Sequence, residues 1–378
     1  MPTVEASKCP VNSWNEWDPL EEVLVGRVLG SYVSTHAFAQ STVQPNEMNS
    51  SGDVSWEPLM FRSFEGQPFP PQMVLAAHVE IEEFVGVLKS LGIQVRRPDP
   101  INSGAPFSTP LWSVPSGYNT MNPRDLVMVM GDQLIEAPTC SRQRYFETFA
   151  WRRVFNEYHR RGARWVSAPK PMLADALYNH HQVPWVKGEE NKPENLMTTE
   201  FEPVFDAASF VRCGRDLFVT RDCVTNRSGI EWLERHLGSE FRIHQIGVTG
   251  PHPLHIDSTF LPIAPGKALA NKDWIGTLPP ILKKWELLEI PKPDPLPKAN
   301  IGMDGFPSET SSYISMNVLS IDGKRIVVEQ NQVSLIKRLK EWGFEPIPLS
   351  YRWPPFFGGG FHCTTLDIRR SGTLQSYF

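Results

Sequence analysis

Apolar and polar positions along this chain recur in one unit: a helical stretch, a glycine and a short apolar strand. In residues 73–98, apolar side chains recur at three- and four-residue spacing, Gly92 follows them, and 93–95 alternates like a strand. This spacing places the apolar side chains on one face of a helix, and glycine commonly ends helices. The pattern therefore predicts an amphipathic helix that leads into a strand.

The same unit occurs four more times along the chain. The stretches that match it are 143–168, 228–246, 277–290 and 332–349, of which 277–290 is the weakest match. An earlier strand is predicted at 23–25, closed by Gly26. A unit that repeats at this scale is the sequence signature of repeat architectures.

Between the helical segments lie β pieces, most of which have two apolar runs around a tight Gly/Asp turn, as β-hairpins do. These pieces are 123–138, 205–220, 256–271, 315–329 and 362–374, and the last is the least clearly a hairpin. Helical segments and β pieces in equal number indicate a radial α/β repeat, and the alternative is an ordinary α/β domain with chance similarity. In a ring the hairpins begin at a common axis, so residues far apart in sequence would meet there.

Two stretches lack this pattern. Residues 31–72 lose all periodicity and are rich in Ser, Gln, Asn, Pro and Gly, which predicts a long loop that covers a site or moves. Residues 291–307 contain too many prolines for a helix or a central strand. We interpret the second stretch as a loop inside one unit, so the chain is predicted to form a single domain over 1–378.

Composition excludes several classes of protein. The 378 residues are 40% hydrophobic and 21% charged, which is ordinary for a globular protein, and the net charge of −5 argues against nucleic acid as a partner. Five cysteines without a CxxC pair argue against a disulfide framework or structural zinc and for a reducing compartment. Residues 1–10 lack the apolar core of a signal peptide, and no apolar run is long enough to span a membrane. These features predict a cytoplasmic protein.

The segment with the clearest chemical potential is a glycine run, 358–360, that leads into Cys363 and then into a strand-like alternation. Glycines let the backbone pass close to a ligand because they have no Cβ. A thiol at the junction of such a loop and a strand is well placed to act as a nucleophile. The plainer alternative is a buried cysteine beside a turn.

Polar residues stand at or near the starts of the predicted β pieces, where a ring would have its centre. They are Asp125, Asp206, His255, Asp257, Ser312 and Cys363. A protonated histidine beside a cysteine favours the thiolate, an aspartate fixes the histidine tautomer, and further carboxylates suit a guanidinium. The set suggests a thiol enzyme that acts on a guanidino compound. Each residue has a structural alternative, namely a core position for the histidine and turn or cap positions for the aspartates.

The sequence also resembles a known family. From about Asn12 to Phe378 it is similar to the glycine (arginine) amidinotransferases, within the guanidino-group-modifying superfamily that adopts a five-bladed α/β propeller, the pentein fold. The matching stretches are NEWDPLEEVLVG (15–26), VRRPDP (95–100), PRD (123–125), IEAP (135–138), APKP (168–171), TEFEPVFDAASFVRCGRD (199–216), HIDSTF (255–260), SMNVL (315–319) and GGGFHCTTLDIRRSGTLQSYF (358–378).

The resemblance implies the catalytic roles. Cys363 matches the nucleophile that takes the amidino group, His255 matches the general acid/base, and Asp206 matches its carboxylate partner. The implied donor is L-arginine, which leaves as L-ornithine, and a primary amine then accepts the amidino group from the cysteine. The resemblance implies no metal or cofactor, and it implies a homodimer.

The resemblance also implies the substrate-binding residues, with two departures. Asp125 and Asp257 match the residues that hold the guanidinium, and Ser312 aligns with a serine near the donor carboxylate. Trp274 stands where glycine-using members carry an arginine, and His252 stands where they carry an asparagine. Together with a local similarity to amidinotransferases of saxitoxin-type toxin pathways, these departures predict a larger amine acceptor in secondary metabolism.

Three alternatives stay open at the level of sequence. They are an L-arginine:glycine amidinotransferase, a deiminase of the same fold in which water resolves the intermediate, and a propeller that binds without catalysis. The reaction products distinguish the first two from transfer to a larger amine. The third predicts that Cys363 forms no covalent adduct.

Overall fold

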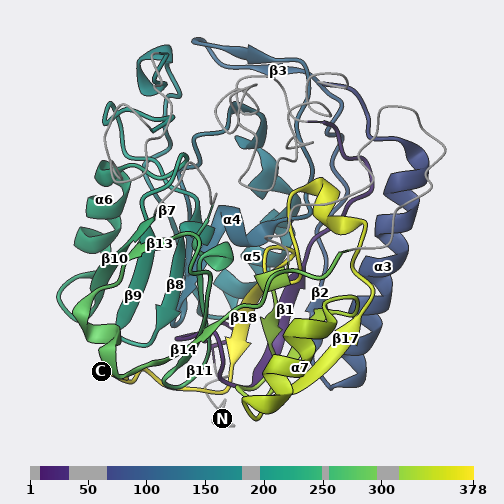
Figure 1. Cartoon of the computed structure of the whole chain (residues 1–378). Coiled ribbons are helices and arrows are strands. Elements are labelled where there is room, and N and C mark those ends of the chain that lie inside the picture. The colour runs from purple at the N-terminus through teal and green to yellow at the C-terminus, as the bar shows by residue number, and fades with distance from the viewer. Residues whose placement is uncertain (1–8, 34–65, 181–195, 249–254, 296–314) are drawn as a thin grey trace, which may run out of the picture.

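The structure is a computed structural model that describes residues 9–33, 66–180, 196–248, 255–295 and 315–378 (Figure 1). It has an α/β fold, as predicted, and its strands form several small sheets rather than one large sheet. The α-helices of the described part are α3 (Pro71–Ser90), α4 (Pro123–Leu126), α5 (Arg152–Arg160), α6 (Arg227–Leu237) and α7 (Val333–Glu341). No helix among the described residues combines the length and the apolar character needed to cross a membrane.

Four sheets share one design, in which an antiparallel hairpin is extended by a third strand that runs parallel to the second. The strands of these sheets are β5 (Val127–Met130), β6 (Gln133–Glu136) and β7 (Arg164–Ser167); β8 (Phe210–Cys213), β9 (Asp216–Thr220) and β10 (Arg242–Val248), with β13 (Ile275–Thr277) at the edge; β11 (Phe260–Ala264), β12 (Lys267–Ala270) and β14 (Glu286–Glu289); and β15 (Leu319–Ser320), β16 (Arg325–Glu329) and β17 (Glu345–Leu349). The predicted unit of hairpin, helical segment and strand is therefore confirmed in these four sheets.

The remaining three-stranded sheet is built from both ends of the chain. Its strands are β18 (Thr365–Arg370), β1 (Leu20–Val25) and β2 (Gln94–Arg96), with β1 in the middle, antiparallel to β18 and parallel to β2. The segment 362–374 thus contributes one strand rather than a hairpin, because the N-terminal strand β1 takes the place of its second strand. A separate small hairpin pairs β3 (Phe107–Ser108) with β4 (Ser113–Val114).

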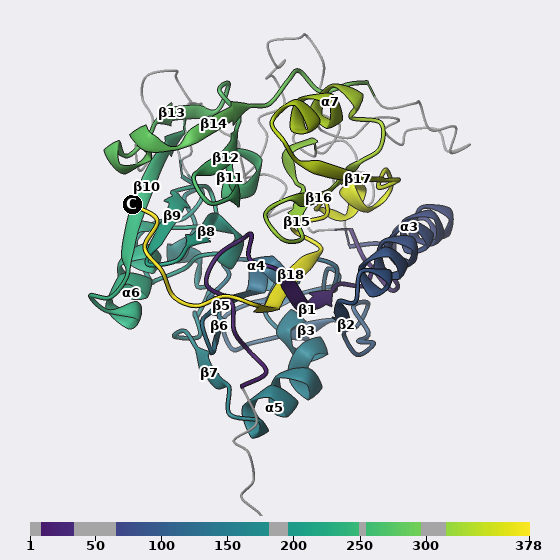
Figure 2. The ribbon, with the colours of Figure 1, turned by 90° about the horizontal axis from the view of Figure 1, so that it is seen from below.

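The helices lie outside the strands, with α3, α5, α6 and α7 at the periphery when the molecule is viewed from below (Figure 2). In α3, apolar residues at helical spacing, among them Ile81, Phe84 and Leu88, are fully buried and pack in one cluster with Val23 of β1. Burial of each such side chain stabilises the fold by about 1.5–3 kcal/mol. The apolar stripe seen in the sequence is therefore the face that fixes this helix to its sheet.

The weakest of the predicted helical segments, 277–290, forms a 3₁₀ helix, η7 (Pro280–Lys284), instead of an α-helix. Pro279 and Pro280 stand at its start, and β14 begins at Glu286. This leaves room for little more than one turn, and proline supplies no backbone N–H for helical hydrogen bonds. The prediction of a helical turn before the strand holds, while its length and type differ.

The segments that precede the first strands of the sheets meet one another. The helix α4, which precedes β5, contacts β18 and also η5 (Ala207–Ser209), which precedes β8. In turn, η5 contacts η6 (Ile256–Ser258), which precedes β11. The starts of the sheets therefore bring together residues that lie far apart in the sequence, and the polar residues picked out from the pattern are among them.

Candidate active site

The Cys363 thiol lies in the turn before β18, with only 6% of the residue exposed. Its Sγ lies 3.2 Å from Oδ2 of Asp257, to which the thiol can donate, and it accepts a hydrogen bond from the Asn317 side-chain amide at 3.1 Å. The Asn317 oxygen in turn accepts the backbone N–H groups of His362 (2.9 Å) and Cys363 (3.1 Å). Asn317 thus fixes both the backbone and the sulfur of the candidate nucleophile.

The glycine run before Cys363 is required by close approaches. A Cβ on Gly359 would lie 2.5 Å from Oδ1 of Asn122 and 2.6 Å from the Cβ of Cys363, and one on Gly360 would lie 2.7 Å from the Cβ of Asn317. Contacts under 3.0 Å are essentially absent for real Cβ atoms. The glycines therefore allow close packing against Asn122 and Asn317, of which Asn317 holds the thiol, and the predicted close approach to a ligand stays a prediction.

His255 stands just before η6 and faces two carboxylates. Its Nε2 lies 3.1 Å from Oδ2 of Asp206, and its Nδ1 lies 3.6 Å from Oδ1 of Asp125. Burial opposes a charge on the ring, but Asp125, Asp206 and a hydrogen bond with Cys363 outweigh it, so the pKa of His255 lies well above its usual value. At neutral pH the side chain is therefore an imidazolium that can donate a proton.

The surroundings of the Cys363 thiol, in contrast, favour its neutral form. Burial and the nearby Asp257 carboxylate raise the pKa of Cys363 to about 12, although hydrogen bonding with His255 acts in the other direction. In the ligand-free protein at neutral pH the group is therefore a thiol. A cation bound against Asp257 would reverse the local electrostatics and favour the thiolate, because an opposite charge nearby stabilises the ionised form. The site is thus suited to become reactive when a cationic substrate binds.

Neutralisation of Asp257 is predicted to activate the free thiol. In Asp257→Asn we expect iodoacetamide to alkylate Cys363 about tenfold faster than in the wild type at one alkaline pH, the change that follows from one pKa unit. The measurement is the rate of labelling of the Cys363 peptide by mass spectrometry. Asp132→Asn, which removes a surface carboxylate paired with Arg164, is the matched control and should leave the rate unchanged. An unchanged or slower rate in Asp257→Asn would contradict the proposed electrostatics.

A guanidinium that the sequence reasoning missed already lies in the site. Arg144 Nη1 donates to Oδ2 of Asp125 at 2.7 Å and lies 4.0 Å from Oδ2 of Asp206. Its remaining nitrogens donate to both carboxylate oxygens of Glu147, at 2.8 and 3.1 Å. Oδ1 of Asp125 and Oδ1 of Asp206 stay buried without a hydrogen-bond partner. Oδ1 of Asp206 therefore remains as an acceptor for a further cationic donor, whereas Oδ1 of Asp125 also faces Nδ1 of His255 at 3.6 Å.

The spacing of these groups also bears on metal binding. One ligand atom from each of Asp125, Asp206 and His255 lies within 4.8 Å of the others, which is close enough to share an ion. Arg144, however, places a positive charge 2.7 Å from Asp125, and the imidazolium of His255 adds another beside the same carboxylates. Two resident cations make the cluster better suited to positioned organic cations than to a metal ion.

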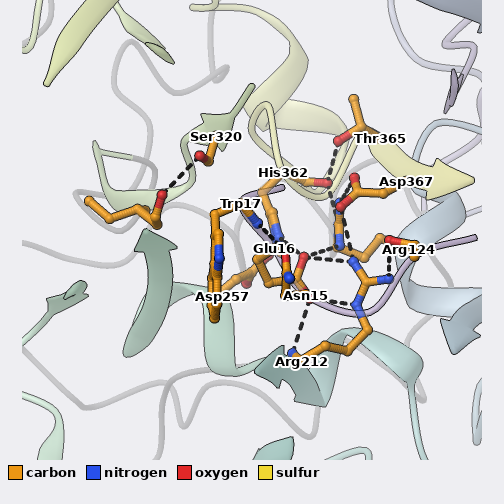
Figure 3. Close-up of polar contacts among 12 residues, drawn as sticks. Asn15, Glu16, Trp17, Arg124, Arg212, Asp257, Ser320, His362, Thr365 and Asp367 are labelled. Carbon is orange, nitrogen blue, oxygen red and sulfur yellow. Dashed lines mark hydrogen bonds and ion pairs between the residues drawn. The ribbon is translucent and has the colours of Figure 1, made fainter. Parts of the chain in front are cut away.

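The Asp257 carboxylate beside the thiol belongs to a buried network of charges, which Figure 3 shows with Glu16, Arg212 and Asp367. His362 Nδ1 lies 2.8 Å from Oδ2 of Asp257, and its Nε2 lies 3.5 Å from Oε2 of Glu16. Burial opposes the charge of Glu16, but Arg212 holds the pKa of that carboxyl well below its usual range with bonds of 2.8 and 2.9 Å. Arg212 also donates to Asp367 at 2.9 Å. The network connects the carboxylate beside the thiol to β8 and β18.

Removal of the central cation of this network is predicted to destabilise the protein. In Arg212→Met, Glu16 and Asp367 lose a buried partner, and breaking a buried ion pair by deleting one member costs about 3–5 kcal/mol. Urea unfolding would measure the loss. The matched control is Arg164→Met, which breaks an exposed pair with Asp132 and should change the free energy of unfolding by at most about 1 kcal/mol. Equal effects in the two variants would contradict a structural role for the network.

Of the residues predicted for the site, the structure brings Cys363, His255, Asp206, Asp125 and Asp257 together. His252 and Ser312 lie outside the described residues. Trp274 is described; it is half-buried in the turn between β12 and β13, where its backbone N–H donates to the carbonyl of Asn271 at 3.1 Å.

Asn317, Arg144 and His362 are the contacts that sequence reasoning missed. Asn317 lies just before the first strand of the fourth β piece, one of the positions that the pattern singled out, where Ser312 was chosen instead. His362 directly precedes the cysteine. Arg144 follows no motif; it reaches the site from a short 3₁₀ helix, η1 (Arg142–Arg144), between β6 and α5.

Comparisons with known proteins place the chain among enzymes of one reaction type. No family model matches the chain. It is 42% identical to an L-arginine:L-lysine amidinotransferase of Pseudomonas savastanoi pv. phaseolicola over 369 residues, 97% of this chain and 96% of that protein. It is also 42% identical to the mitochondrial glycine amidinotransferase of Gallus gallus over 379 residues, 98% of this chain and 85% of that protein.

A solved structure gives the same result for the fold. SxtG, an amidinotransferase from Microseira wollei in the saxitoxin biosynthetic pathway, shares 45% sequence identity and superposes with a TM-score of 0.84 over 98% of this chain and 100% of its own. The chain belongs to the amidinotransferase family. It is a transferase that moves an amidino group, and the resemblance inferred from its motifs is confirmed.

Proposed function

We propose that this enzyme transfers the amidino group of L-arginine to a primary amine through a covalent intermediate on Cys363. The observation that carries the proposal is the buried thiol beside the Asp257 carboxylate and in hydrogen-bonding contact with the imidazolium of His255. The donor is inferred from the L-arginine:L-lysine amidinotransferase that the chain resembles. Oδ1 of Asp125 and Oδ1 of Asp206 have no hydrogen-bond partner, although the first lies 3.6 Å from the His255 ring, and both can accept from a guanidinium.

In the first half-reaction the guanidinium of L-arginine binds against Asp257 and lowers the pKa of the Cys363 thiol, which releases its proton to solvent. The thiolate attacks the guanidino carbon and forms the C–S bond. The bond from that carbon to the side-chain nitrogen of the donor breaks, and His255 gives its proton to this nitrogen as L-ornithine leaves. Asp206, 3.1 Å from the ring, holds the imidazole in orientation.

In the second half-reaction the acceptor amine replaces L-ornithine. Its nitrogen attacks the amidino carbon, His255 takes the proton that the amine loses, and the C–S bond breaks to release the Cys363 thiolate. The proton returns to the histidine that gave it, and the Cys363 thiolate takes a proton from solvent when the cationic product leaves, so the cycle closes without an oxidant, a metal or an organic cofactor. The carboxylates and the imidazolium of the site balance the charges of the reacting groups.

The acceptor is proposed to be an amine larger than glycine, in a secondary-metabolite pathway. The resemblance to SxtG supports this setting. Trp274 stands where the glycine-using pattern has an arginine near the donor carboxylate, and His252 stands where it has an asparagine near the acceptor, so both contacts differ from that pattern. Ser312 is proposed to lie near the donor carboxylate.

We further propose that the five sheets are the blades of a five-bladed α/β propeller, the pentein fold, in a single domain over 1–378. The support is the design common to the three- and four-stranded sheets and the convergence of the segments before their first strands. The homodimer implied by the family resemblance is part of the same proposal. Light scattering on the purified protein would measure the assembly.

Product analysis tests the proposal. The enzyme is incubated with L-arginine labelled in the guanidino carbon, together with glycine, L-lysine or a larger diamine, after treatment with a metal chelator. We expect L-ornithine and a labelled guanidino group on the larger amine. Labelled guanidinoacetate as the main product would favour the glycine amidinotransferase, and citrulline with ammonia would favour the deiminase. If no labelled product forms in any of the mixtures, the result would contradict transfer from L-arginine.

A further inference from the structure

The backbone of His255 is held in a conformation that its side chain disfavours. Its φ and ψ are 71° and 149°, and among the described residues other than glycine only Leu173 also has a positive φ. For a residue with a Cβ this region is sterically costly and persists only where the surroundings enforce it. Such strain at a site residue calls for a structural element that maintains it.

The element that meets this backbone is Asp222, which is buried beside it. Oδ2 of Asp222 accepts the backbone N–H of His255 at 3.1 Å and the Ser209 hydroxyl at 2.7 Å. Oδ1 accepts the backbone N–H of Val224 at 3.1 Å. Both oxygens accept from donors, so the group is fully used as a carboxylate, and an amide could not satisfy the same set.

Further hydrogen bonds connect Asp222 to Asp206, the carboxylate that faces the imidazole. The Thr225 hydroxyl donates to the Ser209 hydroxyl at 2.7 Å and accepts the backbone N–H of Asp206 at 3.3 Å. The Asp206 carboxylate then lies 3.1 Å from Nε2 of His255. A closed circuit therefore runs from the backbone of the histidine through Asp222, Ser209, Thr225 and Asp206 back to its ring.

We propose that Asp222 is a positioning residue for amidino transfer, which fixes the backbone of His255 and, through Ser209 and Thr225, its carboxylate partner. The inference rests on the proposed function, because the role of the circuit is to align the imidazolium of His255 with the departing nitrogen. Asp222 touches the histidine backbone rather than the reacting atoms. Its loss should therefore slow the chemical step and leave the binding of L-arginine nearly unchanged.

The test is the single-turnover rate constant for formation of the amidino adduct on Cys363 with L-arginine, measured by rapid quench and mass spectrometry. For Asp222→Asn we expect a fall of about 10- to 100-fold, with the half-saturating concentration of L-arginine changed less than about threefold. The amide must place an N–H group against either Val224 or His255, so one contact becomes a clash of donors. A destabilised variant with intact alignment would lose amplitude and keep its rate constant.

Thr225 provides a matched pair that tests the other side of the circuit. Thr225→Val removes the hydroxyl at nearly constant volume and is expected to lower the rate constant about fivefold, whereas Thr225→Ser retains the hydroxyl and should stay within about twofold. Adduct formation by the wild type with unchanged rate constants in Asp222→Asn and Thr225→Val would overturn the inference while leaving the proposed function standing. Absence of the adduct in the wild type would instead overturn the proposed function.

Discussion

Replacement of Cys363 by serine is expected to abolish transfer, with a fall in kcat of about 10⁴-fold or more. A serine hydroxyl fits the same space, but its proton is held far more tightly than that of a thiol. Burial and the nearby Asp257 already raise the pKa of the thiol to about 12, so an alkoxide is out of reach even with a cationic substrate bound. The measurement is the rate of L-ornithine release with a saturating acceptor amine.

The matched control for this variant is Cys9→Ser, which makes the same change at a half-buried cysteine that packs against the hydrophobic cluster around Trp151. Its activity is expected to remain within about twofold of the wild type. Thermal unfolding of both variants would show whether the fold is retained. Substantial turnover by a folded Cys363→Ser protein would require a nucleophile other than this residue.

Replacement of His255 by glutamine is expected to lower the rate of the donor half-reaction by about 10²- to 10⁴-fold, the range typical for loss of a general acid. Glutamine preserves part of the polar surface facing Asp206 but cannot protonate the departing nitrogen. His236→Gln, at a histidine beside Gln133 away from the thiol, is the matched control and should change the rate by less than about twofold.

The wild-type pH profile provides a second readout for His255. The carboxylates of Asp125 and Asp206 raise the pKa of the ring, so the imidazolium persists at pH values where an ordinary histidine is neutral. The donor half-reaction should therefore keep its rate from neutral into mildly alkaline solution. A loss of rate centred near pH 6.5, the ordinary histidine pKa, would show that the carboxylates do not act on this residue as the geometry indicates.

The repeated unit and most of the converging polar residues could be predicted from the sequence, because helical spacing, hairpin turns and the residues before each strand are local signals. The pairing of β18 with β1 could not be predicted, because β1 comes from the other end of the chain and no local signal in its sequence indicates which strand it pairs with. Family similarity supplied the residue roles, which local patterns left open between chemistry and structure.

The missed contacts have a common physical reason. Arg144 reaches the site from the end of a three-residue 3₁₀ helix and Asp222 from a loop, so neither periodicity nor strand position identifies them. Arginine and aspartate are common as surface residues in such short connecting segments, and only burial separates these two from the rest. The strained backbone of His255 is likewise invisible in a sequence, because the residue that adopts it is not a glycine.

The most direct test of the account is intact-protein mass spectrometry after mixing the enzyme with L-arginine alone, without an acceptor. The account predicts a mass gain of one amidino group, located at Cys363 by peptide analysis and absent in Cys363→Ser. Citrulline accumulation without an adduct would contradict transfer and favour hydrolysis. If no adduct forms and no turnover occurs, the result would contradict the assignment of L-arginine as the donor and of Cys363 as the group that carries the amidino intermediate.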